Sequence, residues 1–240
     1  MPEATRATAH FLPADYEPNR ARTADPASTY WTPRRVETST LFQYAVYKEA
    51  RALLRGLPRA RVLDIGCGTA RKAAELVIPH CAQYVGLGQE SAVAYCRGTI
   101  RAPNAEFRVA DLEHLAPVDA PAFDLVLCAD VIEHLDDPTP MLAAARHAIR
   151  DGGRLLLSTP ERDVLHGRAA RRPANPDHVR EWNRQELRHY LVSRGFRVVR
   201  AHLAPQFRLA LSDEGIRLAR GVLAHPRAYW ACQVALCEAG

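Results

Sequence analysis

An alternation of short apolar segments with amphipathic segments is the feature of this sequence that most constrains its fold. The expected strands cover residues 61–65, 84–87, 106–110, 123–129 and 154–158, and the expected helices among them cover 69–77, 91–100 and 139–150. Strands that alternate with helices favour a mostly parallel sheet with helices on both faces. Ligands of such sheets bind at the carboxyl ends of the strands, so functional residues are expected directly after each strand.

Further elements are expected towards the C-terminus. A helix over 183–194 is predicted with a capping box, because Asn183 stands at its start and Glu186 follows three residues later. The remaining segments predict a strand over 196–203, a helix over 213–223 and a strand over 229–237. Residues 160–184 interrupt the alternation, and a connection of this length is either a functional loop or a disordered one.

The N-terminal part of the chain has a different character from the rest. Residues 1–39 are expected to form a partly flexible arm, since they are mostly polar and contain five prolines without clear periodicity. A helix over 40–56 follows the arm. Residues 40–240 are long enough to bury a sizeable core and are expected to form one domain.

Composition excludes several classes of protein. The net charge of +5 comes from arginines that are spread evenly, so no nucleic-acid surface is expected. None of the six cysteines has CxxC spacing and no histidine cluster completes a zinc set, so no metal is predicted. The chain shows no signal-peptide core and no apolar run of membrane-spanning length, so a cytoplasmic protein without a membrane partner is expected.

A glycine-containing turn follows the first expected strand. Asp64, Gly66, Cys67 and Gly68 lie between this strand and the next helix. Glycines let backbone N–H groups approach a ligand closely, and the N-terminus of the following helix suits an anion. A dinucleotide-binding dehydrogenase would need a third glycine where Arg71 stands. The segment therefore predicts an anion-binding turn of another family.

Three more segments follow later strands in the same way. The second strand is followed by Gly88, Gln89 and Glu90, and the third by Asp111 and Leu112. The fourth strand ends at Ala129 and leads into the run Glu133-His134-Leu135-Asp136-Asp137-Pro138. A carboxylate such as Asp111 suits an exocyclic N–H donor, and a histidine suits proton transfer near neutral pH.

These four segments, in this order, make the chain resemble the class I S-adenosylmethionine-dependent methyltransferases over about residues 40–203. The resemblance implies a Rossmann-like, doubly wound α/β fold with a seven-stranded sheet, mostly parallel, in which the seventh strand is antiparallel. It implies S-adenosyl-L-methionine as the cofactor, with the 62–68 loop around the methionine part. The run that ends in Asp137-Pro138 is similar to the small-molecule branch of the family, of natural-product or sugar type.

The resemblance also assigns roles to individual residues. The family places an acidic ribose ligand where this chain has Gly88, so Glu90 is preferred as the ribose ligand and Gln89 remains the alternative. Asp111 is expected to accept from the adenine amino group, with Leu112 and Ala129 beside the cofactor. An aromatic hydroxyl before the first strand is expected at the methionine carboxylate; Tyr44 is preferred, although Tyr47 is not separated from it. His134 is expected to face the acceptor as a general base.

Residues 160–184 are expected to form a flap over the acceptor, because the pairing of Ser158-Thr159-Pro160-Glu161-Arg162-Asp163 with the segment 175–183 resembles one subgroup of these enzymes. The side chains expected to contact the acceptor are Trp31, His178, Arg180 and Trp182. An equal alternative is that Arg180 only braces the following helix.

The predicted function is methyl transfer to an oxygen or nitrogen of a small-molecule acceptor. The absence of an acid at position 88 supports a non-catalytic or atypical S-adenosylmethionine-binding protein as the alternative, and a nucleic-acid methyltransferase is a weaker one. The expected partner is the small-molecule acceptor, with no nucleic acid and no membrane; a homodimer is left open.

Overall fold

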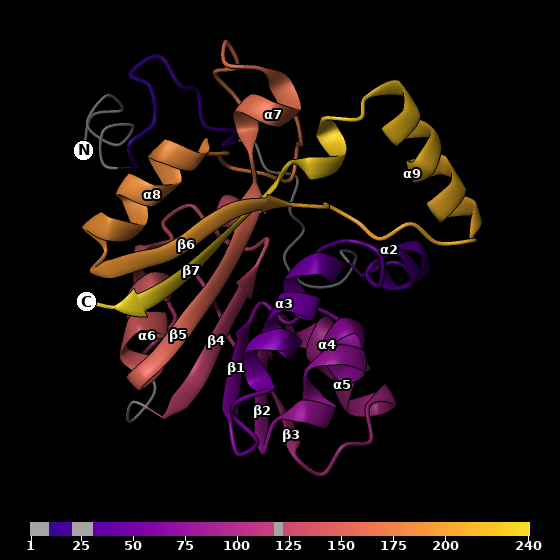
Figure 1. The fold of residues 1–240 in the computed structure, drawn as a ribbon, viewed down its shortest axis with the longest axis vertical. Coiled ribbons are helices and arrows are strands. Elements are labelled where there is room, and N and C mark those ends of the chain that lie inside the picture. The colour runs from indigo at the N-terminus through magenta and orange to yellow at the C-terminus, as the bar shows by residue number, and fades with distance from the viewer. Residues whose placement is uncertain (1–9, 21–30, 118–121) are drawn as a thin grey trace.

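The protein is built on one seven-stranded sheet (Figure 1). The computed structural model describes residues 10–20, 31–117 and 122–240. The strand order across the sheet is β3-β2-β1-β4-β5-β7-β6. The strands are β1 (Arg61–Ile65), β2 (Gln83–Gly88), β3 (Ala105–Val109), β4 (Phe123–Ala129), β5 (Ile149–Pro160), β6 (Phe196–Ala204) and β7 (Cys232–Ala239).

Strands β1 to β5 run parallel to one another. Strand β7 is antiparallel to both of its neighbours, β5 and β6. The expected α/β fold, with a mostly parallel sheet and an antiparallel seventh strand, is therefore confirmed. The strand order reverses at β1, which pairs with β2 on one side and β4 on the other. Ligands of such sheets bind at the carboxyl ends of the strands beside the switch point, which are those of β1 and β4 in this protein.

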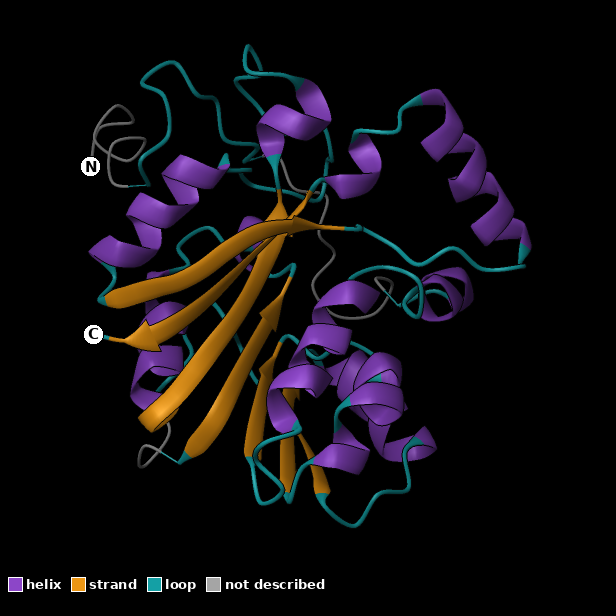
Figure 2. Ribbon diagram, in the orientation of Figure 1, coloured by secondary structure: helices purple, strands orange, loops and turns teal. Residues whose placement is uncertain are grey.

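Helices cover both faces of the sheet (Figure 2). The helices of the described residues are α2 (Pro33–Thr38), α3 (Tyr44–Leu54), α4 (Arg71–Leu76), α5 (Glu90–Thr99), α6 (Thr139–Ala148), α7 (Arg162–His166), α8 (Arg184–Ser193) and α9 (Asp213–Ala224), with short 3₁₀ turns η1 (Ile78–His80), η2 (Ile132–His134) and η3 (Ala228–Trp230). One core cluster joins α3, α4 and α5 to the sheet, and the other joins α6 and α8 to it. Adjacent strand residues serve opposite clusters, as Val62 and Leu63 do.

The start of β5 differs from the prediction. We expected a helix as far as residue 150 and a strand from 154, with the glycine pair between them as the stop. Instead α6 ends at Ala148 and β5 begins at Ile149, so Gly152 and Gly153 lie inside the strand. Gly152 has φ +74°, and a Cβ on Gly153 would lie 2.7 Å from the backbone oxygen of Phe123. The glycines therefore allow a bulge and a close approach to β4.

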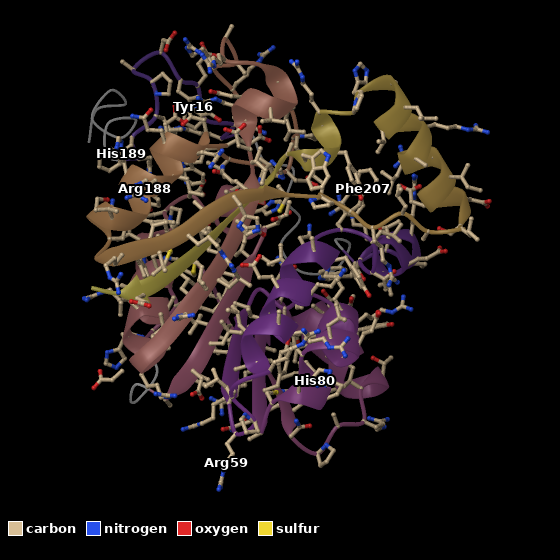
Figure 3. The ribbon with its side chains drawn as sticks, in the orientation of Figure 1. Tyr16, Arg59, His80, Arg188, His189 and Phe207 are labelled. Carbon is tan, nitrogen blue, oxygen red and sulfur yellow. The ribbon has the colours of Figure 1, made fainter. Side chains whose placement is uncertain are left out.

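The described part of the arm packs on the domain. Leu12 and Tyr16 are buried in the core, and Thr32 caps the short helix α2 with its side chain. Tyr16 joins the arm to residues 160–184 (Figure 3): its hydroxyl oxygen accepts a hydrogen bond from the Glu181 backbone N–H. The arm predicted over residues 1–39 also includes residues 1–9 and 21–30, which lie outside the described residues.

Among the described residues, none of the helices combines the length and the apolar character that a membrane crossing requires.

Candidate active site

The turn after β1 approaches its neighbours too closely for side chains. Gly66 and Gly68 have φ values of +79° and +54°, a conformation that glycine adopts without strain. A Cβ on Gly66 would lie 2.4 Å from Val131 Cγ2, and one on Gly68 would lie 2.8 Å from the Trp31 ring. Ala70, where the family usually has a third glycine, also has a positive φ of +49°. The backbone at Ala70 is therefore left-handed, a conformation that glycine adopts more readily than alanine.

Asp64 is the buried acid at the base of this turn. Its Oδ2 accepts hydrogen bonds from the hydroxyls of Tyr47 at 2.9 Å and Tyr84 at 2.6 Å. Its Oδ1 is buried and has no hydrogen-bond partner among the described residues. Burial raises the pKa of the Asp64 carboxyl to about 6, although the two tyrosine hydroxyls and Lys72 act in the opposite direction. A buried carboxylate oxygen without a partner is a place where a cationic ligand group gains most.

The structure separates the two tyrosines that the sequence left as alternatives. Tyr47 reaches Asp64, whereas the Tyr44 hydroxyl donates to Glu75 Oε1 at 2.8 Å and its ring lies 4.4 Å from the Arg208 guanidinium. Tyr44 therefore points along α4 and not to the glycine turn. Tyr47 was named in the sequence but not preferred, because the two residues lie almost one helical turn apart.

A polar network ties the turn to β4 and β5. Lys72 donates to Gln43 Oε1, and the Gln43 amide donates to Asp130 Oδ2 at 2.8 Å. Asp130 also accepts from Ser158 at the end of β5, at 2.6 Å. Burial lowers the pKa of the Lys72 ammonium to about 8, against the opposing effect of Asp130 and Asp64. Gln43 and Lys72 were not predicted as site residues, because a glutamine or a lysine alone does not indicate a binding site in a sequence.

Three of the predicted cofactor residues lie where β2 meets α5. Gly88 is buried, and a Cβ there would meet Cys67 Sγ at 3.6 Å, an ordinary contact. Gln89 is the N-cap residue of α5 and Glu90 is its first residue. Both side chains are exposed and make no hydrogen bond to another described residue. The carboxamide of Gln89 and the carboxylate of Glu90 are therefore both available to a ligand beside the turn.

The segment after β3 forms a compact turn. Asp111 Oδ1 accepts from the Glu113 backbone N–H at 2.9 Å, and Oδ2 pairs with His114 Nδ1 at 2.8 Å. The His114 contact keeps the pKa of the exposed Asp111 carboxyl below its usual value. Leu112 is partly buried against the core. Glu113 accepts from the backbone of Asp136, which links this turn to the loop after β4.

The loop after β4 carries two acid–base side chains into the interior. Ala129 ends β4, and Glu133 and His134 lie in η2. Glu133 is fully buried; its Oε2 accepts from Thr159 at 2.8 Å, while no residue in the described parts of the chain hydrogen-bonds to Oε1. Burial raises the pKa of the Glu133 carboxyl well above its usual range. Burial, together with the nearby His178, lowers the pKa of His134 to about 4.

Residues 160–184, which we call the flap, pack against this loop. Arg180 is buried, and its guanidinium donates to the backbone oxygens of Leu135 and Asp136, each at 2.7 Å. Trp182 is completely buried, and its indole N–H donates to the backbone oxygen of His10. In this conformation both side chains hold the flap on the domain and neither is presented to an open surface.

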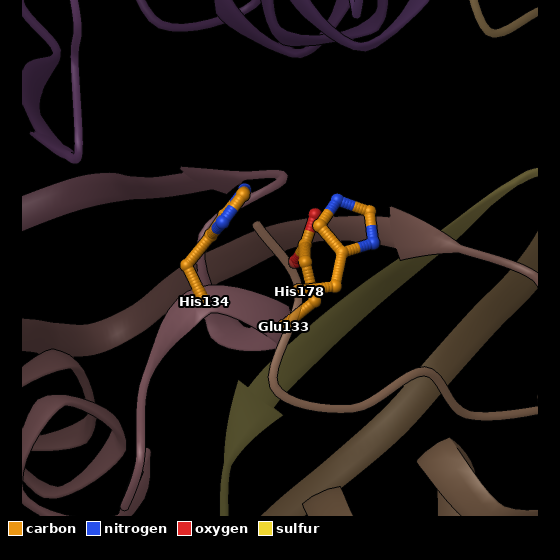
Figure 4. A group of neighbouring side chains, drawn as sticks. All are labelled: Glu133, His134 and His178. Carbon is orange, nitrogen blue, oxygen red and sulfur yellow. The ribbon is translucent and has the colours of Figure 1, made fainter. Parts of the chain in front are cut away.

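The remaining predicted acceptor residues are Trp31 and His178. Trp31 contacts Gly68 at the cofactor turn. The rings of His178 and His134 meet at 4.8 Å between centroids, almost perpendicular to each other (Figure 4). The structure thus brings together Gly66, Gly68 and Trp31 at one point and His134 and His178 at another. Both histidines were predicted at the acceptor, but the contact between their rings was not, because the two residues are distant along the chain.

A groove of about 830 Å³ lies between the arm and the flap. It is lined on one side by arm residues 17–20 and on the other by flap residues that include His166, Arg171 and Arg172. His166 Nε2 lies 3.2 Å from the buried Glu181 carboxylate, which in turn contacts His178. A chain of contacts therefore connects this basic groove to the histidine pair.

The fold and the glycine turn define a class of Rossmann-like proteins, and comparison with known proteins identifies the family. A family model described as "Methyltransferase domain" matches residues 39–201. The chain therefore belongs to the methyltransferase-domain family, and the predicted enzyme class and its S-adenosylmethionine cofactor are confirmed at the level of this family. This match identifies the family and does not assign a branch within it.

Curated relatives agree with this family. A protein of Mycobacterium tuberculosis named "Probable S-adenosylmethionine-dependent methyltransferase" is 32% identical over 184 residues, which cover 75% of this chain and 65% of that protein. A protein with the same type of name from Mycolicibacterium smegmatis is 36% identical over 57% of this chain and 52% of its own length. A ubiquinone biosynthesis O-methyltransferase of Hahella chejuensis is 34% identical over 45% of this chain and 46% of its own. The chain thus spans about half to two thirds of the curated relatives it matches.

Solved structures share the fold at low sequence identity. An S-adenosylmethionine-dependent methyltransferase from Mesorhizobium loti has a TM-score of 0.59 and 19% identity, over 79% of this chain and 95% of that one. Magnesium protoporphyrin IX methyltransferase from Synechocystis PCC 6803, solved with bound SAH, has a TM-score of 0.57 and 17% identity, over 82% and 83%. These likenesses confirm the Rossmann-like methyltransferase architecture.

Proposed function

We propose that this protein transfers the methyl group of S-adenosylmethionine to an oxygen or nitrogen of a small-molecule acceptor. The observation that carries the proposal is the glycine turn at the switch point, with the buried and unpartnered Oδ1 of Asp64 at its base. When bound, the cofactor supplies an electrophilic methyl: the acceptor's lone pair bonds to the methyl carbon while the C–S bond breaks and leaves its electrons on sulfur. The protein has to orient the acceptor and, for a hydroxyl, remove its proton.

The residues at the turn fit this cofactor. Asp64 Oδ1 is placed to accept from an ammonium group, which would satisfy the buried carboxylate. The backbone N–H groups of Gly68 and Thr69 have no acceptor among the described residues, and they stand just before α4, where a carboxylate is favoured. Glu90 is the proposed ribose ligand and Asp111 the proposed adenine ligand.

The proposed ribose ligand leads to a direct test. We expect Glu90→Ala to weaken binding of S-adenosylhomocysteine about tenfold, because a hydrogen bond to a charged acceptor contributes roughly 1.5–3 kcal/mol. Isothermal titration calorimetry measures the change, with Gln89→Ala as the matched variant on the same helix end. Unchanged affinity in Glu90→Ala, with a loss in Gln89→Ala, would transfer the role to Gln89.

The acceptor end of the site is proposed at His134 and His178, beyond the cofactor turn. His134 is the first candidate to take the proton of a hydroxyl acceptor, whereas an amine acceptor needs only to be neutral. We leave Arg180 and Trp182 out of this end of the site, because their side chains hold the flap. The relatives named as O-methyltransferases support an oxygen acceptor. Natural-product or sugar biosynthesis is the narrower setting that we propose.

The role of His134 is tested by its removal. We expect His134→Ala to slow single-turnover methyl transfer to a panel of phenols about 100-fold, and transfer to primary amines much less, because general-base catalysis contributes on the order of 100-fold or more. His147→Ala, which removes an exposed histidine from α6, is the control. Equal rates for His134→Ala and the native protein with phenols would remove His134 as the base.

The whole proposal is tested by calorimetry with S-adenosylmethionine and S-adenosylhomocysteine. We expect both to bind, in a saturable way, to the native chain. Absence of binding by either compound would overturn the methyltransferase function. Tight binding without methyl transfer to any phenol or amine would instead favour the atypical S-adenosylmethionine-binding protein, which Gly88 supports.

A further inference from the structure

Two histidines and a glutamate converge in the interior between η2 and the flap (Figure 4). Glu133 and His134 come from the loop after β4, and His178 comes from the flap. One ligand atom of each side chain lies within 4.8 Å of the others, and this is the one group of three or more metal-ligating residues that the described parts of the chain bring so close. Residues from two separate segments thus point to one place.

The hydrogen bonds of both histidines fix the same tautomer. His134 Nδ1 lies 2.9 Å from the backbone oxygen of Asp177, which only accepts, so Nδ1 carries the hydrogen. His178 Nδ1 lies 2.6 Å from Glu181 Oε1, and Asn175 Nδ2 donates to His178 Nε2 at 2.9 Å, which gives the same assignment. In this tautomer neither Nε2 carries a hydrogen, so each has a lone pair that can coordinate a cation. A carbonyl or carboxylate on the far nitrogen is the arrangement that orients metal-binding histidines.

The third side chain has an unsatisfied oxygen. Glu133 is fully buried, and within residues 10–20, 31–117 and 122–240 nothing hydrogen-bonds to its Oε1, although Oε2 accepts from Thr159. A buried carboxylate oxygen without a partner is costly. A cation at Oε1 would remove that cost.

We propose that Glu133, His134 and His178 bind a divalent transition-metal cation of the Zn²⁺ type. Two imidazoles and one carboxylate are a ligand set of catalytic zinc sites, which keep an open position for a substrate oxygen. Bond lengths of about 2.0–2.2 Å place such ligands roughly 3.5 Å apart, so the cluster closes by about 1 Å on loading. Asn175, which is exposed, gives up its contact with His178 Nε2 in that step.

The site rests on the proposed function and deepens it. An acceptor hydroxyl bound at the open position of the cation has a lowered pKa and loses its proton to solvent, which leaves the oxygen ready for methylation. Nε2 of His134 cannot bind a cation and take a proton at once, so the cation replaces His134 as the activating group. The substrate class is then a small molecule with a metal-binding hydroxyl, and the acceptor atom is oxygen.

Cobalt(II) titration of the chelator-treated protein tests the site. We expect one equivalent of Co²⁺ to bind and give the visible absorption of a four- or five-coordinate ion, with competition by Zn²⁺. His178→Gln and Glu133→Gln should each weaken Co²⁺ binding at least about tenfold. Loss of a residue that only hydrogen-bonds to a metal ligand already lowers metal affinity about tenfold or more, so loss of a ligand should cost at least as much. His147→Ala, whose histidine is exposed, should bind Co²⁺ like the native chain.

The outcomes are distinct. No Co²⁺ uptake by the native protein would overturn the site, as would uptake that His178→Gln leaves unchanged. A thiolate-to-cobalt charge-transfer band would do the same, because it would assign the ion to the buried cysteines. Circular dichroism identifies variants that fail to fold, and His178→Gln serves where Glu133→Gln does not fold. Calorimetry with S-adenosylhomocysteine on the same samples reports the proposed function independently of metal uptake.

Discussion

Replacement of Gly66 by valine is expected to abolish binding of S-adenosylhomocysteine by a folded protein. A Cβ at this position would lie 2.4 Å from Val131 Cγ2, and φ is +79°, where a β-branched residue is strained. The turn or the loop after β4 must therefore move, and the N–H groups of Gly68 and Thr69 move with it. A shift of about 1 Å takes these N–H groups out of hydrogen-bond range, and each lost hydrogen bond to a charged group costs roughly 1.5–3 kcal/mol. Calorimetry at millimolar ligand measures the loss.

Two further variants test whether the contact with Val131 causes the loss of binding: a control at Gly56 and a second-site substitution at Val131. Gly56→Val places the same side chain where nothing lies within 4 Å, so binding should be unchanged. Gly66→Ala should also lose most of its affinity, and Val131→Ala in the same chain should restore part of it, because the contacted Cγ2 is then absent. Native affinity in a folded Gly66→Val protein would show that the turn does not hold the ligand.

Features set by neighbouring residues were predictable from the sequence. The capping box of α8 is present, with Asn183 accepting from the Glu186 backbone and Glu186 accepting from that of Asn183. The glycine turn likewise lies where a strand, two glycines and a helix predicted it. Both depend on hydrogen bonds and dihedral angles within a few residues, so the local residue pattern was sufficient.

Features set by distant contacts were not predictable. The burial of Trp182 against His10 and the hydrogen bond from Tyr47 to Asp64 were not predicted from the sequence. His134 and His178 were both expected at the acceptor, but the contact between their rings was not predicted. Gly152 and Gly153 were wrongly predicted to end a helix; they lie inside β5. Glycine is common both after helices and at strand bulges, so the residue type alone does not distinguish the two. In each case the partner lies on another element, and only the packed fold specifies it.

The second large effect is expected at Asp64. Its Oδ1 is the buried acceptor to which we assign the ammonium group of the cofactor. Asp64→Asn keeps an oxygen for the hydroxyls of Tyr47 and Tyr84, so the fold should persist, but it removes the negative charge. Truncation of one partner of a buried charge pair costs about 2–5 kcal/mol, so we expect at least about 30-fold weaker binding of S-adenosylhomocysteine at pH 7.

The pH dependence separates a charge contact from a structural effect. Burial raises the pKa of Asp64 to about 6 in the unliganded protein, so the carboxyl binds a proton as the pH falls through that value. The protonated form does not attract an ammonium group, and a proton must leave before binding. Affinity should therefore be about tenfold lower at pH 5 than at pH 7 in the native protein. In Asp64→Asn it should be flat over the same range. Equal affinities at the two pH values in the native protein would mean that Asp64 does not bind the ammonium group.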